Sequence, residues 1–256
     1  MNLVRAELLK IRTISLWWGF GLLLLPLWAA ALFFNWASAT SEPTGQDLGV
    51  TVSLVTSGQF FGLLVVLLLG AIMVTNEFHH LTATTTFLTT PRRERVILAK
   101  FAAAIVISLA VWAVVTTLNL VITPIVMADV EMSAQLGASE VWEAIGLNAL
   151  AFALWAILGV GCGVLIRNQL AATLILSTLY VLGTAVVTAV FFVLSDWISG
   201  LEKLDFLVPT VASDLMISGS MLPEGPGRLT GVVVLITYAA VTGAVGTLIT
   251  RRRDIG

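Results

Sequence analysis

Few residues of this chain have the types and spacing that catalysis requires. The two histidines, His79 and His80, are adjacent and lack a nearby catalytic partner, a pattern more typical of surface residues than of metal ligands. The sequence contains no H-E-x-x-H zinc motif, no G-x-S-x-G nucleophile turn and no Walker A motif, since Gly-Lys never occurs. We therefore predict that the chain is not an enzyme and holds no metal or cofactor. If ATP drives it, another chain must bind the nucleotide.

The composition indicates that lipid, rather than water, is the main solvent of the chain. Hydrophobic residues make up 58% of the 256 positions and charged residues 11%, whereas soluble domains carry about 25% charged residues. The mean hydropathy is +1.01. A net charge of −2 does not favour a nucleic-acid partner. We expect one membrane domain over residues 1–256.

Six apolar stretches are long enough to cross a bilayer as helices. They are expected at about 14–35, 57–75, 101–128, 144–166, 170–194 and 229–250. Continuous rather than alternating hydrophobicity predicts an all-α integral membrane fold. None of the stretches contains an ionisable residue, which disfavours ion-driven transport, although backbone carbonyls can also hold Na⁺.

The polar segments between these stretches alternate in charge. The two termini and every second polar segment between them hold 11 of the 13 basic residues. The remaining polar segments hold 11 of the 15 acidic residues. The positive-inside rule therefore places both termini in the cytoplasm. Ala37-Ser38-Ala39 also resembles a signal-peptide cleavage site, but the apolar run before it is longer than a typical signal sequence. We expect the first span to be retained.

An amphipathic helix is expected at residues 2–13, lying along the inner leaflet. Its apolar arc contains an unexpected carboxylate, Glu7, which Lys10 at i+3 would partly neutralise. One interpretation is a carboxylate that reaches toward lipid headgroups or Lys10. The other is an anchor for a partner protein or for a neighbouring helix.

The segment 76–100 is long for a link between antiparallel helices. It begins with Glu77 at the exit of the second span, and Pro91 favours a helix start before a basic run. A solvated basic loop held by anionic lipids would explain the arginines. A short amphipathic helix that docks into another protein would also explain the apolar residues Phe78, Leu81, Phe87 and Leu88.

The segment 196–228 lies on the side of the membrane opposite to the termini. It is acidic but rich in apolar residues, which predicts short re-entrant helices shielded by protein. Small residues Gly159, Gly161 and Gly163 predict tight helix packing, and Asn119 and Asn148 predict hydrogen bonds between helices.

Three motifs of this chain are similar to those of the ABC type-2 export family. They are Ala6-Glu7-Leu8-Leu9-Lys10-Ile11-Arg12-Thr13, then Asn76-Glu77 through Thr82 to Thr90-Pro91-Arg92-Arg93 and Ala99-Lys100, and finally Leu158-Gly159-Val160-Gly161-Cys162-Gly163 before Arg167-Asn168. The chain resembles the permease subunit of that family. Asn76 and Leu81 depart from it, since glycine is common at both positions.

The resemblance implies two permease chains, identical or homologous, and two ATPase subunits that bind ATP and Mg²⁺. It implies ATPase coupling through Glu7, Lys10, Glu77, Thr82, Pro91, Arg92, Arg93 and Arg95. Spans two and five would line the path, so the residues of a possible gate are Gln59, Phe60, Phe61, Tyr180 and Thr184. Packing of these side chains against other helices or lipid is the competing interpretation.

The expected function is export of an apolar or amphipathic substrate across a bacterial cytoplasmic membrane. A membrane scaffold or sensor without transport activity is the alternative, and an intramembrane enzyme is disfavoured by the lack of catalytic motifs.

Overall fold

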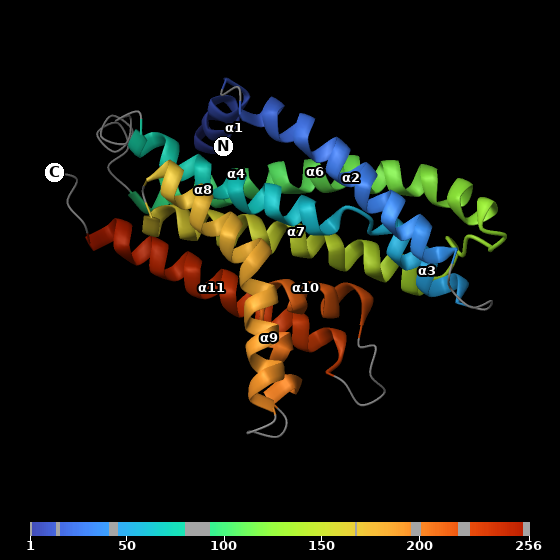
Figure 1. Ribbon diagram of the computed structural model, residues 1–256. Coiled ribbons are helices and arrows are strands. Elements are labelled where there is room, and N and C mark those ends of the chain that lie inside the picture. The colour runs from blue at the N-terminus through green and yellow to red at the C-terminus, as the bar shows by residue number, and fades with distance from the viewer. Residues whose placement is uncertain are drawn as a thin grey trace.

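The computed structural model describes residues 2–13, 16–40, 46–79, 93–166, 168–195, 201–219 and 226–252. Within these ranges every regular element is a helix (Figure 1). The α-helices are α1 (Asn2–Thr13), α2 (Leu16–Ala39), α3 (Asp47–Val55), α4 (Gln59–His79), α6 (Arg93–Asp129), α7 (Ser139–Ile166), α8 (Gln169–Thr178), α9 (Thr184–Ser195), α10 (Pro209–Ser218) and α11 (Arg228–Arg252). A π-helix, η1 (Leu179–Gly183), joins α8 to α9, and a 3₁₀ helix, η2 (Leu201–Leu207), precedes α10.

Six helical segments are long and apolar enough to cross a membrane, which confirms the predicted number of spans and the all-helical class. They are Trp18–Ala39, Asp47–Phe78, Arg95–Asp129, Ser139–Ile166, Gln169–Leu194 and Arg228–Ile249. The second begins earlier than the expected limit near 57, because α3 continues the apolar segment beyond a break in the helix.

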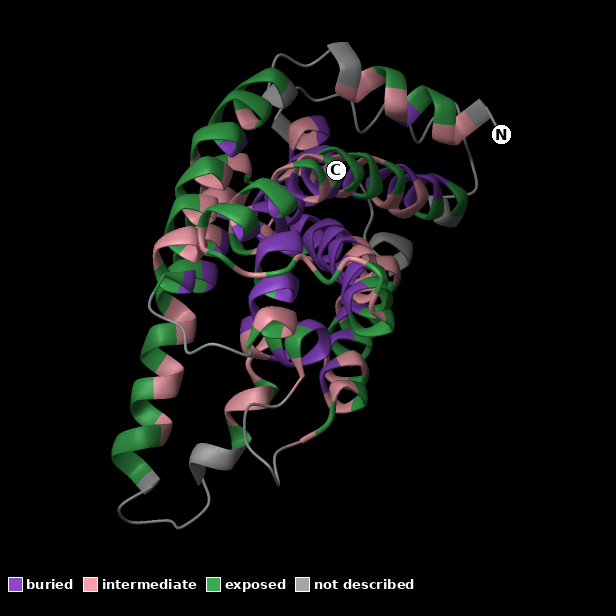
Figure 2. Cartoon of the chain, turned by 90° about the vertical axis from the view of Figure 1, so that its right-hand side faces the viewer, coloured by how far each residue is buried: buried purple, intermediate pink, exposed green. Residues whose placement is uncertain are grey.

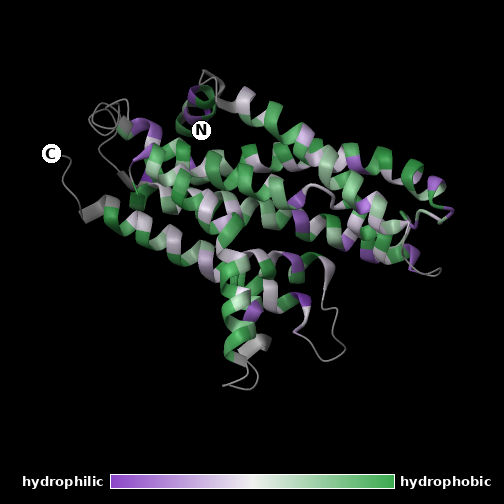
Figure 3. Ribbon diagram, in the orientation of Figure 1, coloured by the Kyte–Doolittle hydropathy of each residue, from purple (hydrophilic) through white to green (hydrophobic). Residues whose placement is uncertain are grey.

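Hydrophobic residues predominate along the long helices (Figure 3), and many of the large ones are exposed on the outside of the bundle. Leu22 is 77% exposed, and Phe34 and Phe192 are exposed to a similar degree. Continuous apolar surface on this scale is not stable in water, so the outer faces of these helices are suited to contact with lipid.

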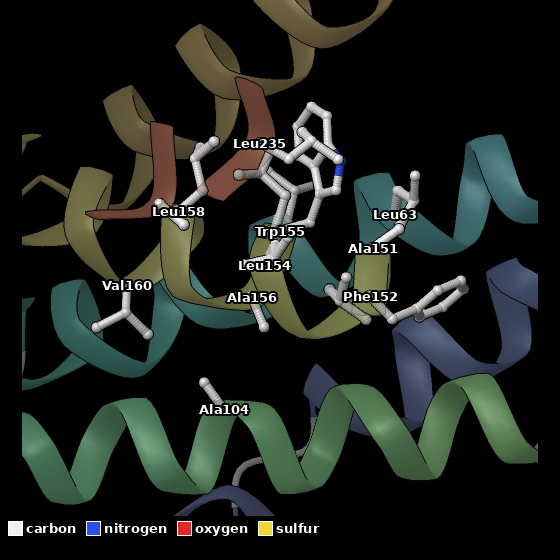
Figure 4. Close-up of a cluster of buried hydrophobic side chains, with 14 of the residues drawn as sticks. Leu63, Ala104, Ala151, Phe152, Leu154, Trp155, Ala156, Leu158, Val160 and Leu235 are labelled. Atoms are coloured by element: carbon white, nitrogen blue, oxygen red, sulfur yellow. The ribbon is translucent and has the colours of Figure 1, made fainter. Parts of the chain in front are cut away.

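The core of the bundle is built around α7, which packs against α4, α6, α10 and α11. Buried residues gather at this centre, whereas α2, α9 and the outer face of α11 are largely exposed (Figure 2). Side chains from α4, α6 and α11, among them Leu63, Ala104 and Leu235, form one buried cluster with Phe152 and Trp155 of α7 (Figure 4). The central helix therefore fixes the positions of its neighbours.

Glycines allow α4 and α7 to approach each other closely. A Cβ atom at Gly159 would lie 2.1 Å from the carbonyl oxygen of Leu67, and one at Gly163 would lie 2.6 Å from that of Ala71. On another face of α7, a Cβ at Gly161 would meet the backbone of Thr242. The prediction that these small residues serve tight helix packing is confirmed.

The second span is interrupted between α3 and α4. Gly58 there has a φ of +78°, a conformation in which glycine is favoured, and a Cβ at this position would lie 2.8 Å from Cδ1 of Trp28. The Asn119 amide nitrogen donates to the carbonyl oxygens of Val55 and Ser57, both at 3.0 Å, while Trp28 Nε1 donates to Asn119 Oδ1 at 2.7 Å. Asn119 thus satisfies backbone groups that the break leaves without helical partners.

The predicted hydrogen bonding between helices is confirmed for Asn119. For Asn148 it is not, since its buried side-chain oxygen has no hydrogen-bond partner among the described residues.

Replacing Asn119 with leucine should lower the free energy of unfolding by about 2 kcal/mol, because two buried carbonyl groups lose their donor. Thr117→Val is the matched control, since the exposed Thr117 hydroxyl donates only to Ala113 of its own helix. Equilibrium unfolding of both variants in mixed micelles measures the difference. Equal stability of the two variants would contradict the role given to Asn119.

The fifth span changes direction at η1, and α9 turns away from α7 (Figure 1). A π-helical turn interrupts the regular α-helical ladder and occurs frequently at functional sites. It directs Tyr180 into the core, where this residue is only 3% exposed.

Candidate functional site

Four charged residues from three helices meet at the end of the bundle where α1 packs against α6. We call them the charged cluster: Glu7 and Lys10 of α1, Glu77 of α4 and Lys100 of α6. Glu7 and Lys10 lie one helical turn apart, so their side chains share a face of α1. Glu77 lies in the last turn of α4, and Lys100 lies two turns into α6.

The two lysines bridge the two carboxylates. Lys10 Nζ lies 2.7 Å from Glu7 Oε1 and 2.6 Å from Glu77 Oε1. Lys100 Nζ lies 2.7 Å from Glu7 Oε2 and 2.8 Å from Glu77 Oε1, and it also donates to the carbonyl oxygen of Met73 at 3.3 Å. Each carboxylate therefore contacts both ammonium groups, and the cluster has no net charge.

Three members of the charged cluster are removed from solvent. Glu7, Glu77 and Lys100 are buried, whereas the Lys10 side chain is 41% exposed. Burial disfavours the charged form of Lys10, but its hydrogen bonds to Glu7 and Glu77 outweigh this effect and raise its pKa above the usual value. The stability of a buried group of charges depends on each member, because removing one side chain leaves an uncompensated charge.

Sequence reasoning identified three of these four residues as one group. It paired Glu7 with Lys10, and the contact of Glu7 with Lys100 now corresponds to the neighbouring-helix alternative. Lys100 was noted only as part of a motif and not as a site residue. Its position among otherwise apolar residues of α6 is the signal that could have identified it, because a buried lysine requires a partner.

Of the remaining residues predicted for coupling, Arg95 is the one whose side chain is described, and it does not join the charged cluster. Thr82, Pro91 and Arg92 lie outside the described residues, and Arg93 begins α6 but its side chain is not described. Arg95 is exposed in the first turn of α6. The coupling role of all five stays a prediction.

The five residues predicted for a gate lie in one region, at the opposite end of α4. Tyr180 donates to the carbonyl oxygen of Phe60 at 2.6 Å, and their ring centroids are 4.9 Å apart. Phe60 also contacts Phe61 edge to face, at 5.3 Å between centroids. Thr184 shares a hydrogen bond with Thr210 of α10, and Gln59 Nε2 donates to Asp214 Oδ1 of α10 at 3.0 Å.

Sequence reasoning missed the residues of α7 and α10 that complete this region. The Trp155 ring packs edge to face on Tyr180 at 5.0 Å, and its Nε1 donates to Ser213 at 2.8 Å. Ser213 in turn donates to the carbonyl oxygen of Pro209. We refer to Phe60, Phe61, Trp155 and Tyr180 as the aromatic cluster. No local pattern in the sequence indicates that α10 contacts it.

A single rigid element connects the two clusters, because α4 begins at Gln59 and carries Glu77 in its last turn. At 1.5 Å per residue, its 21 residues extend about 30 Å. The described residues contain no group of three or more side chains suited to hold a metal ion.

Comparison with known families gives one match, over residues 3–184, to the family described as ABC-2 family transporter protein. The match includes the charged cluster and the aromatic cluster but ends before α10. No curated protein matches the chain.

Proposed function

Because the chain belongs to the ABC-2 transporter family, as its membrane-spanning permease, we propose that it exports an apolar or amphipathic substrate, driven by a separate ATP-binding subunit. The observation that carries the proposal is the link from the charged cluster through α4 to the aromatic cluster. Both clusters contain residues that a transport cycle would have to move together.

The charged cluster is suited to pass force from a partner protein into the membrane. The segment 80–92 follows α4 directly, and α6 follows that segment, so a push on it acts on both helices that carry Glu77 and Lys100. In our proposal this segment forms a coupling helix in a groove of the ATPase, and α1 lies beside it along the inner leaflet. The salt bridges keep the three helix ends together during the movement.

The aromatic cluster is suited to close the path at the other end of α4. Stacked rings at a helix start exclude water, and a small tilt of α4 would separate Phe60 from Tyr180. In our proposal α10 is a re-entrant helix of the external side. ATP binding favours one of two arrangements of α4, as switching of this kind requires.

The charge sorting of the sequence supports the orientation, with both termini in the cytoplasm of a bacterial cell. Six spans are half of a typical export pore, so we propose that two permease chains pair and that two ATPase subunits bind them. ATP and Mg²⁺ are bound by the ATPase subunits.

Purification of the tagged chain in mild detergent tests this function directly. We expect a stoichiometric nucleotide-binding subunit to co-purify and to hydrolyse ATP. Arg92→Glu, which reverses a charge in the proposed coupling helix, should lower the recovered subunit and its ATPase activity about tenfold, the effect of a 1.4 kcal/mol loss.

Arg251→Glu is the matched control, because it reverses a basic charge on the same predicted side but outside the coupling segment. It should leave the recovered ATPase activity unchanged. A wild-type chain that purifies without any nucleotide-binding subunit would favour the alternative, a scaffold or sensor without transport activity.

A further inference from the structure

Asp214 of α10 places a carboxylate beside the aromatic cluster. The hydrogen bond described for this side chain comes from a neutral group, the amide of Gln59, at 3.0 Å. Among the described residues, no salt bridge joins Asp214 to a lysine or arginine. The side chain is also exposed, so it is accessible to a molecule that enters between α4 and α10.

The surroundings of Asp214 are aromatic. Its hydrogen-bond donor Gln59 directly precedes Phe60, which is 40% exposed and whose ring makes a tilted contact with that of Tyr180. A partly exposed aromatic residue and an exposed carboxylate therefore lie near each other.

The electrostatic environment of Asp214 favours the binding of a positively charged group. Neighbouring protein atoms raise the pKa of the Asp214 carboxyl from 3.8 to about 6. The group is still ionised at neutral pH. A cation beside the carboxylate would stabilise its charged form, and an aromatic ring would add cation–π attraction.

We propose that the exporter recognises substrates with a cationic group on an apolar body, and that Asp214 and Phe60 bind this cationic group. The proposal rests on the proposed export function and specifies its substrate class. Asp214 binds the positive charge, and the apolar body contacts Phe60 and Phe61, the two residues of the aromatic cluster that are not buried. An anionic substrate of the same shape would be repelled.

A structural role for Asp214, limited to holding Gln59 in place, is the competing explanation. Asp214→Asn separates the two, because the asparagine side-chain oxygen can still accept the hydrogen bond from Gln59 while the negative charge is lost. We therefore expect this variant to keep its fold but to lose its binding of a cation.

Tetraphenylphosphonium and tetraphenylborate are suitable probes, because the two ions have nearly the same size and apolar surface but opposite charge. Equilibrium dialysis against the purified chain in phosphatidylcholine nanodiscs, corrected with empty nanodiscs, measures their binding. We expect saturable binding of tetraphenylphosphonium that weakens about tenfold in Asp214→Asn and is retained in Asp214→Glu. Tetraphenylborate should show no saturable binding to the wild-type chain.

Asp205→Asn is the matched control, since Asp205 lies on the same external segment but in a separate hollow beside Phe192. It should leave tetraphenylphosphonium binding unchanged. Equal binding of both ions, or an unchanged affinity in Asp214→Asn, would overturn the proposal. Since this measurement needs no ATPase, such a result together with a co-purifying ATPase subunit would overturn the substrate class alone and leave the export function standing.

Discussion

Replacing Lys100 with methionine is expected to lower the free energy of unfolding by about 3–5 kcal/mol. Methionine matches the length of the lysine stem, so the packing around it is largely kept. The change removes the ammonium group that lies within 2.8 Å of both buried carboxylates. Among the described ion pairs, those of Glu7 and Glu77 with Lys10 would remain, and Lys10 is partly exposed to solvent.

Equilibrium unfolding in mixed micelles, with denaturing detergent as the titrant, measures this loss. Arg95→Met on the same helix is the control and should change stability by less than about 0.5 kcal/mol, because the Arg95 side chain is exposed. The double variant Lys100→Met with Glu7→Gln should recover part of the loss, since it also removes one of the unpaired negative charges. A Lys100→Met chain as stable as Arg95→Met would show that the charged cluster does not hold the helices together.

The second large effect is expected for Gly159→Ala, in the contact between α4 and α7. A Cβ there would lie 2.1 Å from a backbone oxygen of α4, and neither backbone can move without separating the two helices. Overpacking of this kind in a core costs about 1–3 kcal/mol, and a backbone clash belongs at the upper end of that range.

Gly146→Ala, in the same helix, should have the opposite sign. Nothing lies within 4 Å of a Cβ at Gly146, and alanine is the better helix former by about 1 kcal/mol. The two single-methyl changes can be compared by the same unfolding measurement. A loss of stability in both variants would mean that α7 resists substitution everywhere, and the close approach at Gly159 would not explain it.

Local hydrophobicity made the six spans predictable, since a bilayer requires about 20 apolar residues for each helix. The break in the second span was not predictable. The polarity of the residues from Thr56 to Gly58 fits a turn inside the span as well as it fits a loop that precedes the span. The group that stabilises the break, Asn119, comes from a helix 62 and 64 residues away in the sequence.

In the candidate site, too, local spacing was predictable and contacts between distant helices were not. Glu7 and Lys10 were paired by their helical spacing, but the contact with Lys100 depends on how α1 packs against α6. Five gate residues were grouped by resemblance to a family. Trp155 and Asp214 were missed, because their contacts with this group depend on where α7 and α10 lie.

The charged cluster also sets an order for assembly during synthesis. Glu7 and Lys100 are 93 residues apart in the chain, so at about 5–20 residues per second the ribosome releases Lys100 roughly 5–20 seconds after Glu7. Until then the ion pairs of Glu7 and Glu77 with Lys100 cannot form, and of the charged cluster Lys10 is the cation already present. The first helix can therefore take its final place only after the third span has emerged, and a nascent chain stopped before that point would present an uncompensated negative charge to the insertion machinery and to proteases.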